Sequence, residues 1–174
     1  MKKLLTIILI LSTSALFAQT FYISPSGNDA ANGSVATPWK TLSKATATVT
    51  SGIIHVNAGT YTESQTLNLA TGVSIEGDGA ATTIIKSTAS NQWSSFLQLE
   101  SGQNTNGNQS ISGISFDGGY TTESNYKTWI AIWVIGRSNV KVFNCKFIGY
   151  YASANIFDGF DATDPLSDPG VTAT

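Results

Sequence analysis

A run of aspartates near the C-terminus is the first group of residues whose type and spacing suits metal chemistry. Asp158, Asp161, Asp164 and Asp168 follow one another at short intervals. Hard oxygen ligands of this kind suit Ca²⁺. The spacing is not that of an EF-hand loop, and Asp-Gly and Asp-Pro pairs are ordinary turn formers. The sequence therefore predicts either a calcium site formed by Asp158, Asp161 and Asp164 or a solvated polar tail.

Aromatic side chains gather in an earlier segment of the chain. Tyr126, Trp129 and Trp133 are close in sequence, and flat rings bind sugars because their apolar body is buried while the polar tip stays wet. Trp129 and Trp133 lie on the outer face if the core residues are Ile130, Ile132 and Val134. Aligning FLQLESG (96–102) with IAIWVIG (130–136) on their glycines favours the opposite parity, with both tryptophans in the core. We expect a carbohydrate-binding platform of Trp129, Trp133 and Tyr126, or else buried tryptophans.

The sequence offers a histidine, a cysteine and a pair of carboxylates as further reactive groups. His55 is the sole histidine, without a visible partner, and is expected on the surface. Cys145 lies close to Phe147 and is expected in the core. Asp78 and Asp117 follow strands at similar places, as the two carboxylates of a glycosidase would. Each precedes a glycine, however, and a simple turn also explains them.

Basic and loop residues give weaker signals. A base for proton abstraction would come from the last strands, but none of the candidates there has a recognisable partner: Lys127, Arg137, Lys141 and Lys146. Three loop residues could bind a cation, although turn formation explains them equally well: Asn28, Asp29 and Asn32.

Composition limits the class of protein. Charged residues make up 11% of the chain, against an average near 25%, which is typical of turn-rich β proteins. The single cysteine excludes an internal disulfide. Without Lys2 and Lys3, the 9 basic residues fall to 7 against 11 acidic ones, a net charge of −4. No basic run is present, so nucleic acid is not an expected partner.

The N-terminus has the layout of a secretory signal peptide. Lys2 and Lys3 precede the apolar run LLTIILIL (4–11) and the small-residue stretch STSALFA (12–18). The run is shorter than the about 20 residues that a membrane span needs. We expect cleavage after Ala18, or else after Ala15, and a secreted or periplasmic monomer that does not stay in the membrane.

The rest of the chain alternates short strands with turns. One helix is predicted, over residues 41–49, where Leu42, Ala45 and Val49 form a stripe and Thr41 or Ser43 can cap it. Gly52 is expected to end it. From residue 53 onward, apolar segments of mostly three to six residues are separated by Gly, Asn, Asp, Ser or Thr. Strands this short must stack on one another to bury a core.

An internal repeat points to a stacked architecture. ISGISFDG (111–118) matches VFNCKFIG (142–149) at an offset of 31 residues, and VSIEGDG (73–79) with TIIKS (83–87) is a weaker copy. Such offsets are typical of solenoids, whereas a sandwich shows longer strands and short hairpins. A solenoid end exposes unpaired strand edges, and the predicted helix is placed to cap one.

The sequence also resembles a known superfamily. FYISPSGNDAANG (21–33), TPWKTLSKA (37–45), GIIHVNAGTYTE (52–63) and GVSIEGDG (72–79) are similar to the N-terminal region of right-handed parallel β-helix proteins of the pectate-lyase-like superfamily, and SNVKVFNCKFIGY (138–150) looks like one of their coils. The resemblance implies that Ile54 and Val56 point inward and His55 outward. It also places Val140, Val142 and Phe147 inside, and Asn144 at a turn where an asparagine stack would be interrupted by Gly113 and Gly77.

The fold prediction is thus an all-β, right-handed parallel β-helix with a short N-terminal capping helix. We expect a signal peptide over 1–18, a strand, loop and capping helix over 19–52, coils over 53–150 and a polar segment over 151–174. Fewer coils are readable than in functional members of the superfamily, so we expect an N-terminal part of a longer solenoid. The resemblance implies action on extracellular polysaccharide, by a lyase of acidic glycans with Ca²⁺, or by a glycosidase. The alternative is a non-catalytic glycan-binding or structural module.

Overall fold

The computed structural model describes residues 18–89, 95–119, 128–150 and 153–158. The predicted signal peptide therefore lies almost entirely outside the described residues. No helix in the described ranges is both long enough and apolar enough to cross a membrane.

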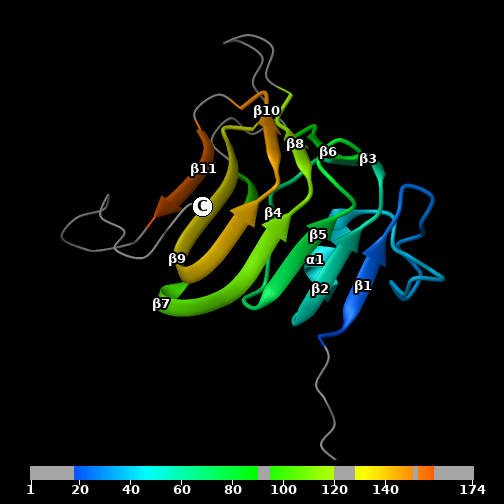
Figure 1. Cartoon of the computed structure of the whole chain (residues 1–174), viewed down its shortest axis with the longest axis horizontal. Helices are drawn as coiled ribbons and strands as arrows, with labels where there is room; N and C mark the ends of the chain where they lie inside the picture. The colour runs from blue at the N-terminus through cyan, green and yellow to red at the C-terminus, as the bar shows by residue number, and fades with distance from the viewer. Residues whose placement is uncertain (1–17, 90–94, 120–127, 151–152, 159–174) are drawn as a thin grey trace, which may run out of the picture.

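The described chain is built from two parallel sheets (Figure 1). The larger sheet has the strand order β1 (Thr20–Ile23), β2 (Gly52–Val56), β5 (Val73–Gly77), β7 (Ser95–Ser112), β9 (Ile130–Phe143) and β11 (Ser153–Asp158), and β4 (Leu67–Asn68) pairs with β7. The smaller sheet contains β3 (Gly59–Glu63), β6 (Thr83–Ser87), β8 (Ser115–Asp117) and β10 (Lys146–Ile148). The all-β expectation is confirmed, with parallel pairing between all the strands named here.

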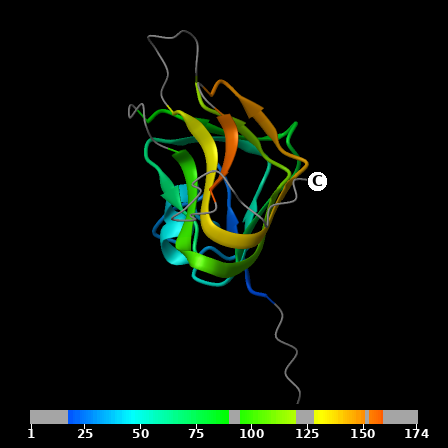
Figure 2. The ribbon, with the colours of Figure 1, turned by 90° about the vertical axis from the view of Figure 1, so that its left-hand side faces the viewer.

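The two halves of the long strand β7 pair with different strands. The first half of β7 pairs with β4, through Leu67 and Leu97. Its second half pairs with β5, through Ile75 and Ile111. The long strand β9 pairs with both halves of β7, with register shifts between them. The chain thus runs from the larger sheet to the smaller sheet and back, and Figure 2 shows the strands arranged around a common interior.

Residues that are 31 positions apart in the predicted repeat are paired with each other in the sheets. Ile111 pairs directly with Val142, and Phe116 pairs with Phe147. The weaker copy is also confirmed, because Ile85 pairs with Phe116 in the next strand along. Equivalent residues of successive copies therefore lie side by side, about 4.8 Å apart as in any sheet.

Alternate residues face the core, as expected. Ile54 and Val56 are fully buried, whereas the intervening His55 is half-buried on the other side of the strand. In β9, Val140 is buried, and Val142 packs partly buried against the core. Phe116 lies at the centre of an aromatic cluster, with Phe96 at 5.8 Å and Phe147 stacked on it at 5.6 Å between ring centroids.

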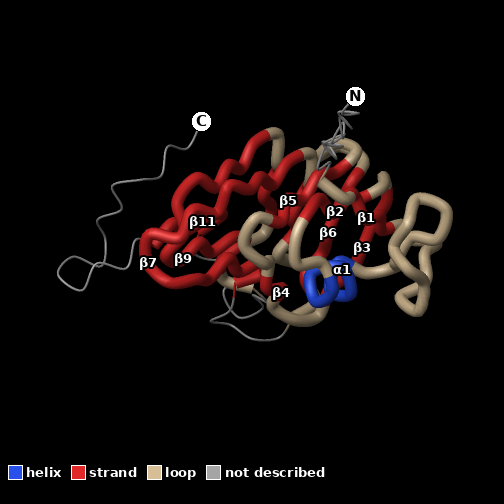
Figure 3. Tube along the Cα trace, turned by 90° about the horizontal axis from the view of Figure 1, so that it is seen from below, coloured by secondary structure: helices blue, strands red, loops and turns tan. Residues whose placement is uncertain are grey.

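The predicted helix is present and lies alongside the strands, close to β3 and β4 (Figure 3). Helix α1 (Leu42–Thr48) contacts β1, β3 and β4. Thr41 is its N-cap and accepts a hydrogen bond from the Lys44 N–H at 3.0 Å. The predicted stripe is buried: Leu42, Ala45 and Val49. Gly52 does not end the helix, because Val49 already has an extended backbone.

Residues 24–41 cover the free edge of β1. The Tyr22 N–H donates to the Gly33 carbonyl at 2.8 Å, and the Tyr22 carbonyl accepts from the Trp39 N–H at 2.9 Å. The Trp39 ring stacks on Phe21 at 5.4 Å and donates from Nε1 to the Ala31 carbonyl at 2.8 Å. The edge that would otherwise attract another strand is therefore paired within the chain.

Candidate functional site

Trp133 lies on the outer face of the larger sheet. Its partner in β7 is Gln98, while the inward neighbours of both residues are buried: Leu97, Leu99, Ile132 and Val134. The glycine-based alignment, which favoured the opposite parity, was wrong by one residue, because Ser95 and not Phe96 pairs with Ile130. The cause is a register shift after Glu100, where β7 has more residues than β9.

The aromatic platform is only partly exposed. Trp129 and Trp133 are both half-buried, and their indole nitrogens are buried. Tyr126 lies outside the described residues. The role of these three residues in binding carbohydrate stays a prediction.

The calcium prediction falls mostly beyond the described ranges. Asp158 ends β11 and pairs in register with Ile135, whose other neighbour is Glu100. Asp161 and Asp164 lie outside the described residues, as do Asp168 and Lys127. Within those that are described, no group of three or more His, Cys, Asp or Glu side chains could hold a metal ion.

A polar depression lies on the outer face of β5, β7 and β9. Its volume is about 170 Å³, and it is lined by side chains that are hydroxyl- or amide-bearing apart from one lysine: Ser74, Asn108, Gln109, Ser110, Asn139 and Lys141. Ser74, Ser110 and Lys141 belong to three neighbouring strands and have the outward parity. The Ser110 N–H donates to Ser74 Oγ at 3.0 Å, which ties β7 to β5 at the floor of the depression.

Two asparagines form the rim of the depression through an unusual backbone. Asn108 and Asn139 have φ values of 43° and 54°, a left-handed conformation that Asn tolerates better than most residues. Asn139 Nδ2 donates to Asn108 Oδ1 at 3.4 Å and to Asn106 Oδ1 at 3.2 Å. The chain therefore stacks side-chain amides at this turn, which sequence reasoning missed.

The stack expected at Asn144 is interrupted, as predicted. Asn144 has φ 52° and follows β9 where Gly113 follows β7. A Cβ at Gly113 would lie 2.3 Å from the Gly77 carbonyl oxygen, so the backbones approach too closely for side chains there.

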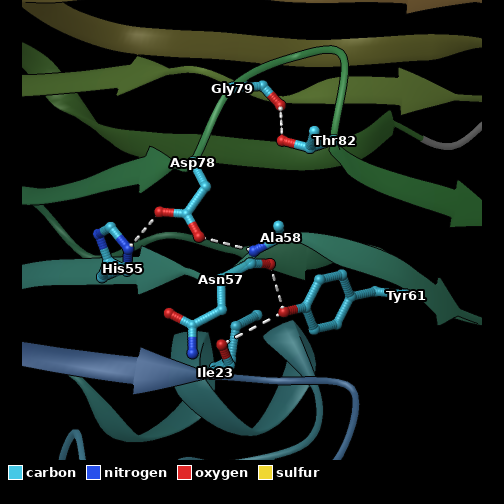
Figure 4. A network of polar contacts seen from close by, with 8 residues as sticks. All are labelled: Ile23, His55, Asn57, Ala58, Tyr61, Asp78, Gly79 and Thr82. Carbon is cyan, nitrogen blue, oxygen red and sulfur yellow. Dashed lines mark hydrogen bonds and ion pairs between the residues drawn. The ribbon is translucent and has the colours of Figure 1, made fainter.

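A histidine and an aspartate pair lies on the same outer face (Figure 4). His55 Nε2 and Asp78 Oδ1 are 2.9 Å apart, with side chains 28% and 41% exposed. Asp78 Oδ2 accepts from the Ala58 N–H at 2.8 Å. The Tyr22 ring lies 5.3 Å from the imidazole, and Glu76 is the next residue in register. A carboxylate that accepts from Nε2–H leaves Nδ1 as the free acceptor.

The expectation that His55 has no partner was wrong. Asp78 is 23 residues away in the sequence, and only the pairing of Val56 with Gly77 brings it beside the end of β2. Comparing HVNAG (55–59) with EGDG (76–79) as successive copies of one coil is the signal that could have found it.

Several other candidate residues have structural roles. The Arg137 side chain is buried and donates to the carbonyls of Leu69 and Glu100, and burial lowers its pKa. Asp29 accepts from the Lys40 N–H at 2.8 Å within the loop that covers β1. Asn28 and Asn32 also accept backbone hydrogen bonds there, from Ala30 and Ser34.

The remaining candidates do not form a site together. Asp78 follows a strand of the larger sheet, whereas Asp117 lies in the smaller sheet, 4.0 Å from Lys86. Lys141 and Lys146 are exposed, as expected. Cys145 packs partly buried against the core, and burial raises the pKa of its thiol.

The comparisons with known proteins identify a family but no activity. No curated protein and no solved structure matches the chain significantly. A family model described as a protein of unknown function, DUF1565, matches residues 25–146. This range covers β2 to β9, the capping helix and both parts of the outer face described above. Because the match spans more than half of the 174 residues, the chain belongs to the DUF1565 family.

Proposed function

We propose that the chain is a secreted, right-handed parallel β-helix that binds extracellular polysaccharide on the outer face of its larger sheet. Parallel pairing, alternation between two sheets and the 31-residue register support the β-helix. Right-handedness is supported by the strong preference of parallel connections for that hand. The pattern of residues 1–18 supports secretion.

The observation that carries the binding proposal is the polar depression at Ser74, Ser110 and Lys141. Sugars present many hydroxyl groups, and side-chain hydroxyls and amides match them as both donors and acceptors. Two aromatic side chains lie on the same outer face, Tyr22 in β1 and Phe143 in β9, two residues beyond Lys141. Phe143 is 42% exposed, so a sugar ring can stack against it.

Filling the depression tests the proposal. The purified chain is titrated by calorimetry with neutral and acidic polysaccharides, alongside a Ser110→Leu variant. The control is Thr62→Leu, which adds the same side chain to an exposed outward position of the smaller sheet. We expect Ser110→Leu to weaken binding by about tenfold or more, as loss of one good contact does, and Thr62→Leu to leave it unchanged. Failure of the wild-type chain to bind any of the polysaccharides, or equal binding by Ser110→Leu, contradicts the proposal.

The predicted aromatic platform is tested separately. If Trp129 and Trp133 stack on sugar, Trp133→Ala weakens binding while far-ultraviolet circular dichroism shows the native strand content. Unchanged affinity in a folded Trp133→Ala variant removes Trp133 from the binding surface.

Cleavage of polysaccharide is a second candidate function, favoured by the His55–Asp78 pair. An imidazole held by a carboxylate can act as a general base through its free nitrogen, and this one faces outward beside Tyr22 and Glu76. The check is the release of new reducing ends from each polysaccharide that binds. Cleavage that persists in His55→Gln, or no cleavage by the wild-type chain, leaves binding as the function.

Calcium and secretion have their own tests. If Asp158, Asp161 and Asp164 hold Ca²⁺, calorimetric titration with Ca²⁺ gives a binding signal that a triple Asp→Asn variant lacks. If residues 1–18 are a signal peptide, the chain recovered from the medium or periplasm of expressing cells begins at Gln19. A chain that keeps Met1 contradicts export by this route.

A further inference from the structure

The charges on the outer face follow a definite order across the strands. Lys141 in β9 is exposed, and the outward residues in the second half of β7, Ser110 and Ser112, are uncharged. Glu76 in β5 is paired in register with Ser112 and with His55, and Asp78 follows two residues later. Within the described ranges, the ion pairs involve neither Lys141 nor Glu76. One cation and a group of carboxylates thus stand at separate places on one surface.

The spacing of these charges is close to the spacing of sugars. Neighbouring strands lie about 4.8 Å apart, so Lys141 and Glu76, two strands apart, are separated by about 10 Å along the stack. A pyranose residue in an extended polysaccharide advances by nearly one strand spacing. A chain lying across the strands therefore places one sugar near each of β9, β7, β5 and β2.

From this arrangement we infer that the ligand is a sparsely acidic polysaccharide. A sugar carrying a carboxylate or sulfate lies beside Lys141, and the sugars that face Glu76 and Asp78 carry no negative charge. A polyuronate places a carboxylate against Glu76 within the about 10 Å over which charges act at moderate salt. The inference rests on the proposed function, because it uses the same surface.

Three probes separate the possibilities: a neutral β-glucan, polygalacturonate, and a soluble polysaccharide with one uronate in each tetrasaccharide repeat. The wild-type chain is expected to bind the tetrasaccharide-repeat polymer most tightly and polygalacturonate most weakly. Lys141→Gln should lower affinity for the tetrasaccharide-repeat polymer about fivefold more than it lowers affinity for the β-glucan at low salt, because only the charged polymer loses an ion pair. Glu76→Gln should raise affinity for polygalacturonate by a similar factor.

The matched control is Lys146→Gln, which removes an exposed charge from the smaller sheet. Tightest binding to polygalacturonate, or no effect of either charge variant, overturns the inference. The proposed function survives that result if Ser110→Leu still weakens binding of whichever polymer the chain prefers by about tenfold or more. If no polymer binds, the proposed function and the inference fail together, and the binding signal of Ser110→Leu is then absent as well.

Discussion

Arg137 is a buried cation whose partners in the structure are neutral oxygens. Only 7% of the residue is exposed. Its Nη1 donates to the Leu69 carbonyl at 2.9 Å and to Gln109 Oε1 at 3.1 Å, and its Nη2 donates to the Glu100 carbonyl at 2.7 Å. These partners come from β7 and from the residue that follows β4, so one guanidinium joins three successive passages of the chain.

Removing this guanidinium is expected to destabilise the protein strongly. Arg137→Met removes this donor from two buried oxygens, the Leu69 carbonyl and Gln109 Oε1, and from the part-buried Glu100 carbonyl. Each buried oxygen left unsatisfied costs about 1–3 kcal/mol. We expect the free energy of unfolding in urea to fall by about 3 kcal/mol. Arg137→Lys should restore part of the loss, since an ammonium lacks the planar fork. A loss no larger than that of Lys146→Met, at an exposed position, contradicts this role.

Glu63 is a buried acid at the end of β3 whose side chain accepts hydrogen bonds from the N-terminus of α1. The residue is 3% exposed, and its Oε1 accepts from the Leu42 N–H at 2.7 Å and from the Ser43 N–H at 3.3 Å. Burial raises its pKa, although the two backbone donors act in the opposite direction. The raised pKa means that the folded state holds this proton to a higher pH than the unfolded state does.

Stability should therefore fall as pH rises from the ordinary glutamate pKa through the raised pKa of Glu63, because the folded state binds more protons over that window. Glu63→Gln keeps a carbonyl oxygen for the helix N–H groups and should flatten this pH dependence in urea unfolding. Glu63→Ala should also lower the free energy of unfolding by about 1 kcal/mol, because the helix loses a capping acceptor. A Glu63→Gln variant with the pH profile of wild type refutes the assignment.

At the scale of elements, Asp29 joins the covering loop to the helix. Its Oδ1 accepts from the N–H groups of Lys40 and Thr41 at 2.8 and 3.0 Å, and its Oδ2 accepts from Thr41 Oγ1 at 2.9 Å. Thr41 is itself the N-cap of α1. The Asp29 carboxylate thus connects the loop that covers β1 to the N-terminus of α1.

Asp29→Ala is expected to lower the free energy of unfolding by about 2 kcal/mol, since charge-assisted hydrogen bonds to Thr41 and Lys40 are lost. Asn28→Ala is the neighbouring control, because Asn28 Oδ1 accepts the Ala30 N–H within its own turn and does not reach the helix. Urea unfolding of both variants measures the difference. Equal losses would mean that Asp29 acts only within its own turn.

At the scale of the whole molecule, stability depends on rows of core residues that cross the strands. Tyr61, Ile85, Phe116 and Phe147 are paired one after another through β3, β6, β8 and β10. Phe116 is fully buried in the middle of this row, whereas Phe147 is partly buried against it. Each strand is too short to be stable alone, so the row supplies the cohesion of the smaller sheet.

Phe116→Ala should cost about 3–5 kcal/mol, in the range of buried aromatic truncations, and the transition should stay cooperative. Phe147→Ala should cost less, because that ring is already partly exposed. Urea unfolding followed by circular dichroism compares the two variants. A larger loss of unfolding free energy for Phe147→Ala than for Phe116→Ala would contradict the central role of Phe116 in this row.

The helix, the core-facing side chains and much of the register could be predicted from the order of the residues. The helix stripe at Leu42, Ala45 and Val49, the inward parity of Ile54 and Val56 and the offset that pairs Phe116 with Phe147 were all readable. These features depend on local periodicity and on repetition, which a linear pattern carries directly. The parallel, all-β character followed from them.

The contacts between polar groups from distant segments, by contrast, depend on the folded chain. His55 and Asp78, Glu63 and the helix N–H groups, and Arg137 and the Leu69 carbonyl are each brought together by a register between distant segments. The pairing of β7 with β9 has extra residues in β7 after Glu100. The alignment on glycines therefore misplaced Trp133 by one residue. A strand reverses its faces with every residue, and a single insertion in a turn therefore changes which side chains reach the surface without changing the apolar pattern.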